Sequence, residues 1–130
     1  MKITKSRIRQ IIKEEVARAL NENTLEQALR DSGKNNNPVI RISDNQYMQV
    51  RPVIAYDGNR RVITGYAVDF GTRATKDGIS GSGMMASADG ANGSSKAIDI
   101  ALQKIQQQAE EGKGPYGTAP IDMNAKVTVL

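Results

Sequence analysis

The side chains that most often carry acid–base, nucleophilic and metal chemistry are missing from this chain of 130 residues. It contains no histidine and no cysteine. Disulfides, thiolate metal sites, Ser-His-Asp and Cys-His arrangements and the commonest zinc ligand are therefore excluded. Carboxylates, lysine and tyrosine remain, but Asp69 and Asp99 are no evident pair, and the sequence brings no two carboxylates together. We predict no catalytic residues, no metal site and a protein that is not an enzyme.

Two glycine-containing patterns have features of ligand sites, and we interpret both as structural. Residues 81–86 (GSGMMA) have the G-x-G-x-x-A spacing of a dinucleotide-binding turn, which needs a helix immediately after it. Residues 88–93 (ADGANG) would interrupt that helix, so we predict no cofactor. Residues 57–59 and 89–92 have the composition of turns, without the alternating acids and closing glutamate of a calcium loop.

The basic charge of the chain is concentrated at its N-terminus. The formal net charge is +4, and residues 1–18 hold six basic side chains against two acidic ones, which leaves twelve of each for the rest. The six are Lys2, Lys5, Arg7, Arg9, Lys13 and Arg18. They are candidate partner-binding residues that would attract an acidic surface, and the alternative is an ordinary solvated helix face. A nucleic-acid partner would also be held through this segment.

Hydrophobic spacing predicts a helical arm followed by a globular body. Residues 4–20 are expected to form an amphipathic helix, with an apolar stripe of Ile8, Ile12, Val16, Ala19 and Leu20. A second short helix is expected over residues 24–31, and the asparagine-rich segment after it has the composition of a linker. We therefore divide the chain into a charged helical arm, residues 1–33, and an α+β body, residues 34–130.

The body begins with a predicted antiparallel β-meander. A short strand over 39–43 is followed by strands over 46–56 and 61–70, which are joined by the hairpin signal Asp-Gly-Asn-Arg at 57–60. The second strand should lie at an edge or carry a bulge at Pro52, because proline lacks a backbone donor. Alternation predicts two apolar faces, formed by Met48, Val50, Ile54 and Tyr56 on one strand and by Val62, Tyr66, Val68 and Phe70 on the next.

Residues 71–93 are predicted to be a glycine-rich loop. Six of the twelve glycines lie there, together with serines and alanines. A loop of this length is usually functional or mobile. Met84 and Met85 are candidate partner-binding residues, because two adjacent thioethers form an adaptable hydrophobic contact. The alternative is that one of them fills the protein's own core.

A long helix and a last strand complete the predicted body. The helix is capped by Ser94 or Ser95 and ends at Gly112, with a buried face of Ile98, Ala101, Leu102, Ile105 and Ala109. Residues 121–130 alternate apolar and polar side chains, which predicts a strand in the chain's own sheet or in that of a neighbour. The fold class is α+β: an N-terminal amphipathic helix, an antiparallel β-meander, one long helix packed on the sheet and a C-terminal strand.

The opening of the chain, MKITKSRIRQIIKEE, resembles a leader found on many otherwise unrelated proteins of marine tailed bacteriophages. Just after it, Leu20-Asn21-Glu22 is similar to the Leu/Ile-x-Glu pattern that prohead proteases of large tailed phages cut. The leader implies nothing about the remainder of the chain. Together the two resemblances imply a phage-encoded protein that is delivered into the head or trimmed there, in the virion or in the cytoplasm of the host cell.

The expected order of helix, three strands and helix is similar to the double-stranded RNA-binding domain. Ser95-Lys96-Ala97, followed by Ala101 and Leu102, resembles the start of that family's second helix. The sequence departs from the family because Lys96 stands alone where the family has paired lysines, the Pro-x-His of its loop is absent and the body is electrically neutral. This resemblance implies the alternative of a nucleic-acid-binding protein.

No segment of the chain approaches the run of about 20 apolar residues that spans a bilayer, so we expect no membrane partner. The leading hypothesis is a non-enzymatic phage virion or assembly protein without a cofactor. In this hypothesis the charged helical arm binds a protein partner or associates with itself, and the body packs by its sheet.

Overall fold

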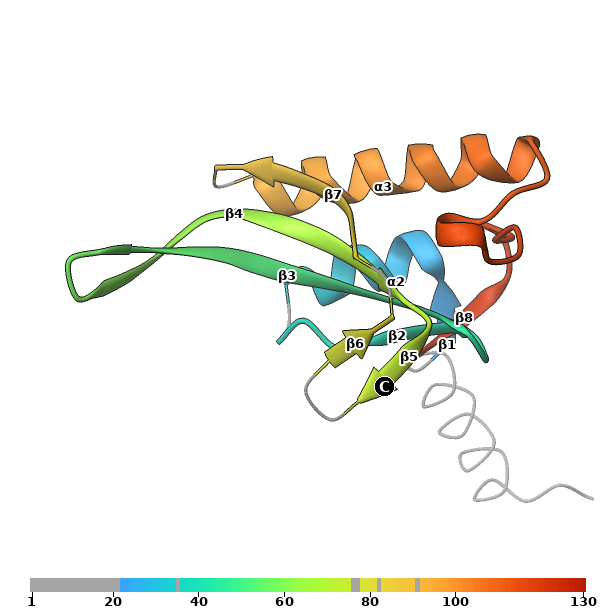
Figure 1. Ribbon diagram of the computed structural model, residues 1–130, viewed down its shortest axis with the longest axis horizontal. Helices are drawn as coiled ribbons and strands as arrows, with labels where there is room; N and C mark the ends of the chain where they lie inside the picture. The colour runs from blue at the N-terminus through green and yellow to red at the C-terminus, as the bar shows by residue number, and fades with distance from the viewer. Residues whose placement is uncertain (1–21, 35, 76–77, 82, 91) are drawn as a thin grey trace, which may run out of the picture.

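An antiparallel sheet with two helices on one of its faces forms the body of the protein (Figure 1). The structure is a computed structural model that describes residues 22–34, 36–75, 78–81, 83–90 and 92–130. The helix expected over residues 4–20 lies outside these described residues. The mixed α+β class, the antiparallel sheet, the long helix and the C-terminal strand are confirmed.

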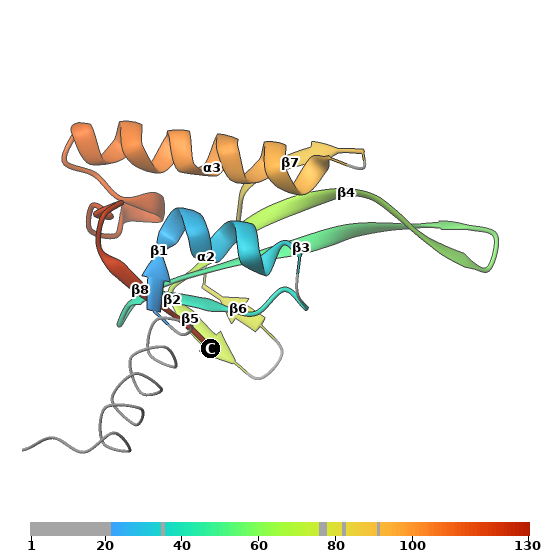
Figure 2. The ribbon, with the colours of Figure 1, turned by 180° about the vertical axis from the view of Figure 1, so that it is seen from behind.

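Six of the described strands make the main sheet, in the order β1-β8-β2-β3-β4-β7, and two more, β5 and β6, form a separate hairpin. Both helices lie on the same face of the main sheet (Figure 1 and Figure 2). The elements in chain order are β1 (Glu22–Thr24), α2 (Leu25–Ser32), β2 (Ile40–Ser43), β3 (Gln46–Asp57), β4 (Arg60–Gly71), β5 (Arg73–Thr75), β6 (Gly78–Ser80), β7 (Met84–Asp89), α3 (Gly93–Glu110), a 3-10 turn (Pro115–Gly117) and β8 (Lys126–Val129).

The hydrophobic core lies between the sheet and the two helices. Leu25 and Leu29 of α2, Ile98 and Ile105 of α3 and Phe70 of β4 are at most 1% exposed. Each such side chain contributes about 1.5–3 kcal/mol by leaving water. α2 belongs to the charged arm by its position in the sequence, yet it packs in the same core as α3. The described part of the arm is therefore continuous with the body.

α3 follows its expected apolar stripe with two differences. Its N-cap is Asn92, one residue before the glycine that opens the helix, and neither of the expected serines. Ala109, expected on the buried face, is only half-buried. The helix ends before Gly112, as expected, where a φ of +73° favours glycine.

Arg30 links the two helices at the surface. Its guanidinium donates hydrogen bonds to Asp99 of α3 at 2.7 Å and to Glu26 of its own helix at 3.2 Å. The bond to the Asp99 carboxylate raises the pKa of Arg30 above its ordinary value. Both carboxylates are more than half exposed, so each pair contributes at most about 1 kcal/mol. The Arg30–Asp99 pair therefore connects α2 to α3 at the surface and contributes little to the stability of the fold.

Residues 71–93 are not the loop that their composition predicts. They contain the β5–β6 hairpin and the edge strand β7, which pairs with the inner half of β4. A Cβ on Gly65 of β4 would lie 2.4 Å from the carbonyl oxygen of Ala88, so glycine permits this close pairing. The sequence of β7, MMASAD, has low intrinsic strand preference. Backbone hydrogen bonds to β4, which only the tertiary fold supplies, make it a strand.

A β-bulge divides the β3–β4 hairpin into an inner and an outer part. Thr64 has no partner across the ladder, because the register shifts by one residue there. The shift puts Ile63, instead of Val62, on the same face as Tyr66. The expected alternation of Val62 with the apolar residues of the inner part is therefore wrong.

The turn and the proline of this hairpin agree with the sequence prediction. β3 and β4 are joined at Gly58, whose φ is +64°, and Asp57 pairs with Arg60. Pro52 lies beside the bulge, in a part of β3 that β2 does not reach. An edge position next to a bulge is where a strand tolerates a residue without a backbone donor.

β8 lies inside the chain's own sheet, between β1 and β2. It is shorter than the strand expected over 121–130, because a turn precedes it. The carboxylate of Asp122 accepts a hydrogen bond from the backbone amide of Asn124 at 2.9 Å, as in an Asx turn. Ile121 is buried before this turn begins, so it reaches the core without being part of the strand.

We expect Gly65→Ala to lower the free energy of unfolding by about 1–3 kcal/mol, because the new Cβ would overlap the Ala88 carbonyl and displace β7. Gly83→Ala is the matched control, since its Cβ would meet only the Tyr116 hydroxyl at the ordinary contact distance of 3.5 Å. Urea unfolding followed by circular dichroism measures both variants. Equal stabilities would contradict the pairing of β7 with β4.

Candidate partner-binding surface

The outer part of the β3–β4 hairpin projects beyond the helices and the other strands (Figure 1 and Figure 2). We call this part, residues 53–64, the β-ribbon. β2 pairs with β3 only as far as Met48, and β7 pairs with β4 only as far as Gly65. At the base of the β-ribbon, the backbone amide of Gly90 donates a hydrogen bond to the Thr64 carbonyl at 2.9 Å. Beyond this contact, no described strand pairs with either edge of the β-ribbon. All its side chains from Ile54 to Thr64 are exposed.

Four large apolar side chains of the β-ribbon are exposed to solvent. Ile54 is 37% exposed, Tyr56 70%, Val62 40% and Ile63 55%. Ile54 pairs with Ile63 and Tyr56 with Arg61 across the ladder, so these four share one face, and Val62 lies on the other. The first face continues the face of β3 that the helices cover in the inner part of the hairpin, at Met48 and Val50. Neighbouring exposed apolar side chains are typical of a binding surface.

Two arginines stand at the tip of the β-ribbon. Arg60 and Arg61 follow the turn, and neither has an ion-pair partner among the described residues. At the base of the hairpin, by contrast, Arg51 bonds to Asp69 across the ladder. Tyrosine and arginine are the side-chain types that dominate binding energy at interface centres. The β-ribbon thus combines an apolar face with unpaired positive charge.

The two candidate methionines have different surroundings. Met85 is 7% exposed and belongs to the core, whereas Met84 is 51% exposed. The hydroxyl of Tyr116 donates a hydrogen bond to the Met84 carbonyl at 2.6 Å, and both residues line an open hollow of about 300 Å³. Met84 stands at the end of β7 that is farther from the β-ribbon. One methionine therefore fills the core, and Met84 alone is exposed for a contact.

The six basic candidates, Lys2, Lys5, Arg7, Arg9, Lys13 and Arg18, lie outside the described residues. They precede β1, which is an edge strand of the main sheet. Their role in partner binding stays a prediction.

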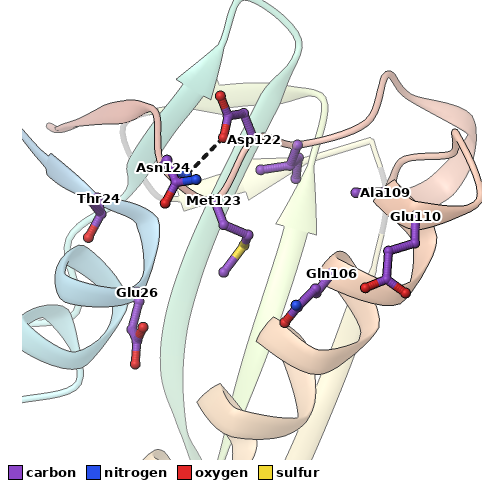
Figure 3. A pocket seen from close by; sticks show the side chains of 9 residues that line it. Thr24, Glu26, Gln106, Ala109, Glu110, Asp122, Met123 and Asn124 are labelled. Atoms are coloured by element: carbon purple, nitrogen blue, oxygen red, sulfur yellow. Dashed lines mark hydrogen bonds between the residues drawn. The ribbon is translucent and has the colours of Figure 1, made fainter.

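An open groove of about 660 Å³ lies between the start of α2, the end of α3 and the segment before β8 (Figure 3). We call it the acidic groove. Glu26 stands on the α2 side, Glu110 on the α3 side and Asp122 above them, and Met123 lies between the two helices. Ile121 also lines it, and none of its lining residues is basic. The groove is therefore a mixed polar and apolar surface that carries three carboxylates and no basic side chain.

Metal and membrane sites were searched for over the same described residues. No group of three or more acidic, histidine or cysteine side chains there is arranged to hold a metal ion. No described helix is long and apolar enough to cross a membrane.

Sequence reasoning missed the exposure of the β-ribbon and the groove. The alternate positions of Ile54 and Tyr56 predict an apolar face, which we expect to be buried. The pattern does not show whether the rest of the fold covers that face. A signal was present in the strand lengths: the strand expected over 39–43 is half as long as the strands over 46–56 and 61–70. A short neighbour cannot cover the full length of a long hairpin.

Comparison of the chain with models of protein families, with curated proteins and with solved structures gives no match.

Proposed function

We propose that this protein is a non-enzymatic assembly protein that binds another protein through its β-ribbon. The observation that carries the proposal is the exposure of Ile54, Tyr56 and Ile63 on one face of a projecting ribbon, with Val62 exposed on the other face. Burying such a face stabilises a complex by about 25 cal/mol per Å² of apolar surface. A two-stranded ribbon is marginally stable alone and gains order from a partner. The surface that receives it is therefore apolar.

The N-terminal leader supports a place for this protein in a phage virion, or in virion assembly in the host cytoplasm. Its resemblance to leaders on marine tailed-phage proteins covers the first residues only, and the body contributes the contact surface. In this proposal the N-terminal segment directs the protein to the particle, and the β-ribbon fastens the body to a neighbouring protein.

Nucleic acid is the second candidate partner, favoured by the unpaired Arg60 and Arg61 at the ribbon tip. Two-stranded ribbons enter DNA grooves in several protein families. We rank this candidate second because the positive charge of the chain is concentrated in residues 1–18, and the remainder holds equal numbers of basic and acidic side chains. A ribbon that grips phosphates is usually supported by further basic residues on the body.

Photo-crosslinking from the ribbon distinguishes the two kinds of partner. With p-benzoylphenylalanine in place of Tyr56, which is 70% exposed, we expect irradiation in the producing cell to yield a crosslinked species that protease removes and nuclease does not. The same group in place of Ile100, an exposed residue of α3, is the control and should crosslink weakly. A nuclease-sensitive product would instead favour nucleic acid, and no product at position 56 would contradict a contact there.

Ile63→Glu should weaken that crosslink, because a carboxylate on the apolar face must be desolvated in the complex. We expect a loss of binding of about tenfold or more, which corresponds to about 1.4 kcal/mol. Ile100→Glu, which places the same charge on α3, should leave the yield from position 56 unchanged. Both side chains are exposed, so unfolding free energies should stay within about 0.5 kcal/mol of the parent protein. An undiminished crosslink in Ile63→Glu would mean that this face does not contact the partner.

Binding to a duplex oligonucleotide tests the second candidate by fluorescence anisotropy. We expect the double variant Arg60→Ala/Arg61→Ala to bind as the parent chain does, with a shallow salt dependence that reflects no more than about six phosphate contacts from the N-terminal segment. If the double variant loses binding while circular dichroism shows a folded protein, the β-ribbon is a nucleic-acid arm.

A further inference from the structure

We infer that the acidic groove binds the basic N-terminal segment, residues 1–21, of a second copy of this protein. The groove lies at the end of α3, whereas the β-ribbon projects past the start of that helix. This self-association is therefore independent of the contact proposed for the β-ribbon, and either can hold without the other.

The shape of the groove suits one side of a helix. Its walls are two helices, its volume is about 660 Å³, and Ala109, Ile121 and Met123 supply apolar lining. Met123 packs against the hydrophobic core, which holds this part of the lining in place. Amphipathic helices bind in such grooves by their apolar face, with charged side chains left at the rim.

None of the residues that line the groove is basic. Among the described residues, Glu110 and Asp122 have no ion-pair partner, and Glu26 shares Arg30 with Asp99. Asp122 accepts one hydrogen bond, from the neutral amide of Asn124. The carboxylates of Glu110 and Asp122, which have no ion-pair partner among the described residues, attract a basic partner over a distance of about one Debye length.

The N-terminal segment has both an apolar stripe and basic side chains, which are complementary to the apolar lining and the carboxylates of the groove. Residues 1–21 contain six basic and two acidic side chains, and Ile8, Ile12 and Val16 recur at helical intervals. A helix over the expected 4–20 would be about 25 Å long. Its stripe would pack on the apolar lining, and its basic side chains would meet the three carboxylates.

The direction of β1 favours a second copy over the same chain. Thr24 lines the groove and pairs with Lys126, and Glu22 pairs with Thr128 at the other end of this antiparallel pair. From Thr24 back to Glu22, β1 therefore runs away from the groove of its own chain, over a length of about 7 Å. This direction, away from the groove that Thr24 lines, favours a groove on a neighbouring copy.

The molar mass of the full-length protein in solution tests the association. We expect light scattering after size exclusion to show dimers or larger species in about 0.1 M salt, and monomers in about 1 M salt, where the Debye length falls to about 3 Å. Glu110→Lys should give monomers at both salt concentrations. Asp89→Lys, an equal charge change on an exposed residue of β7, should associate as the parent does. Circular dichroism checks that both variants are folded.

Two single-cysteine chains identify the contact, since the natural chain has no cysteine. A mixture of Ile12→Cys with differently tagged Asn124→Cys should form a disulfide-linked heterodimer on mild oxidation, on the order of tenfold more than Ile12→Cys with Ser87→Cys, because binding raises the local thiol concentration. Each chain has one thiol, so this bond joins two copies.

A monomeric parent protein would overturn the inference, and so would association that survives Glu110→Lys in a folded protein. Equal crosslinking of Ser87→Cys and Asn124→Cys would place the contact outside the groove. Association that is lost in Ile63→Glu but kept in Glu110→Lys would assign self-assembly to the β-ribbon and contradict the groove.

Discussion

The antiparallel ladder between β3 and β4 holds the rest of the described molecule in place. It runs from Tyr47 and Gly71 at its inner end to Asp57 and Arg60 at the turn, with one bulge on the way. The inner part offers its edges to β2 and β7 and its apolar side to the two helices. Because β2 and β7 are much shorter than the hairpin, no described strand covers either edge of the outer part beyond Thr64, whose carbonyl accepts a hydrogen bond from Gly90. The same ladder thus builds the core and exposes the β-ribbon.

Close backbone contacts hold β7 and the start of α3 against β4. Gly65 and Gly93 approach the carbonyl of Ala88, where a Cβ would lie 2.4 Å and 2.5 Å from its oxygen. These contacts join β4, β7 and the start of α3 at the base of the β-ribbon. A ribbon that is anchored at its base loses less conformational freedom when it meets a partner than an unanchored one.

Charge is unevenly distributed along the chain. The net positive charge of the chain comes from the residues before β1, and carboxylates from three separate segments line the acidic groove. The apolar β-ribbon and the acidic groove stand at opposite ends of α3. A protein with two different surfaces at its two ends is suited to link neighbours in an assembly, and this is the kind of role that we propose.

The sequence by itself determined what depends on composition and on local periodicity. The lack of histidine and cysteine excluded whole classes of chemistry, and local spacing located α2, the β3–β4 hairpin with its turn at Gly58, and α3. Only the tertiary structure decided β7, the bulge at Thr64, the exposure of Ile63 and the meeting of Glu26, Glu110 and Asp122 in one groove. These features depend on pairing and packing between segments far apart in the chain, and no local pattern encodes where a strand's neighbour ends or which carboxylates a fold brings together.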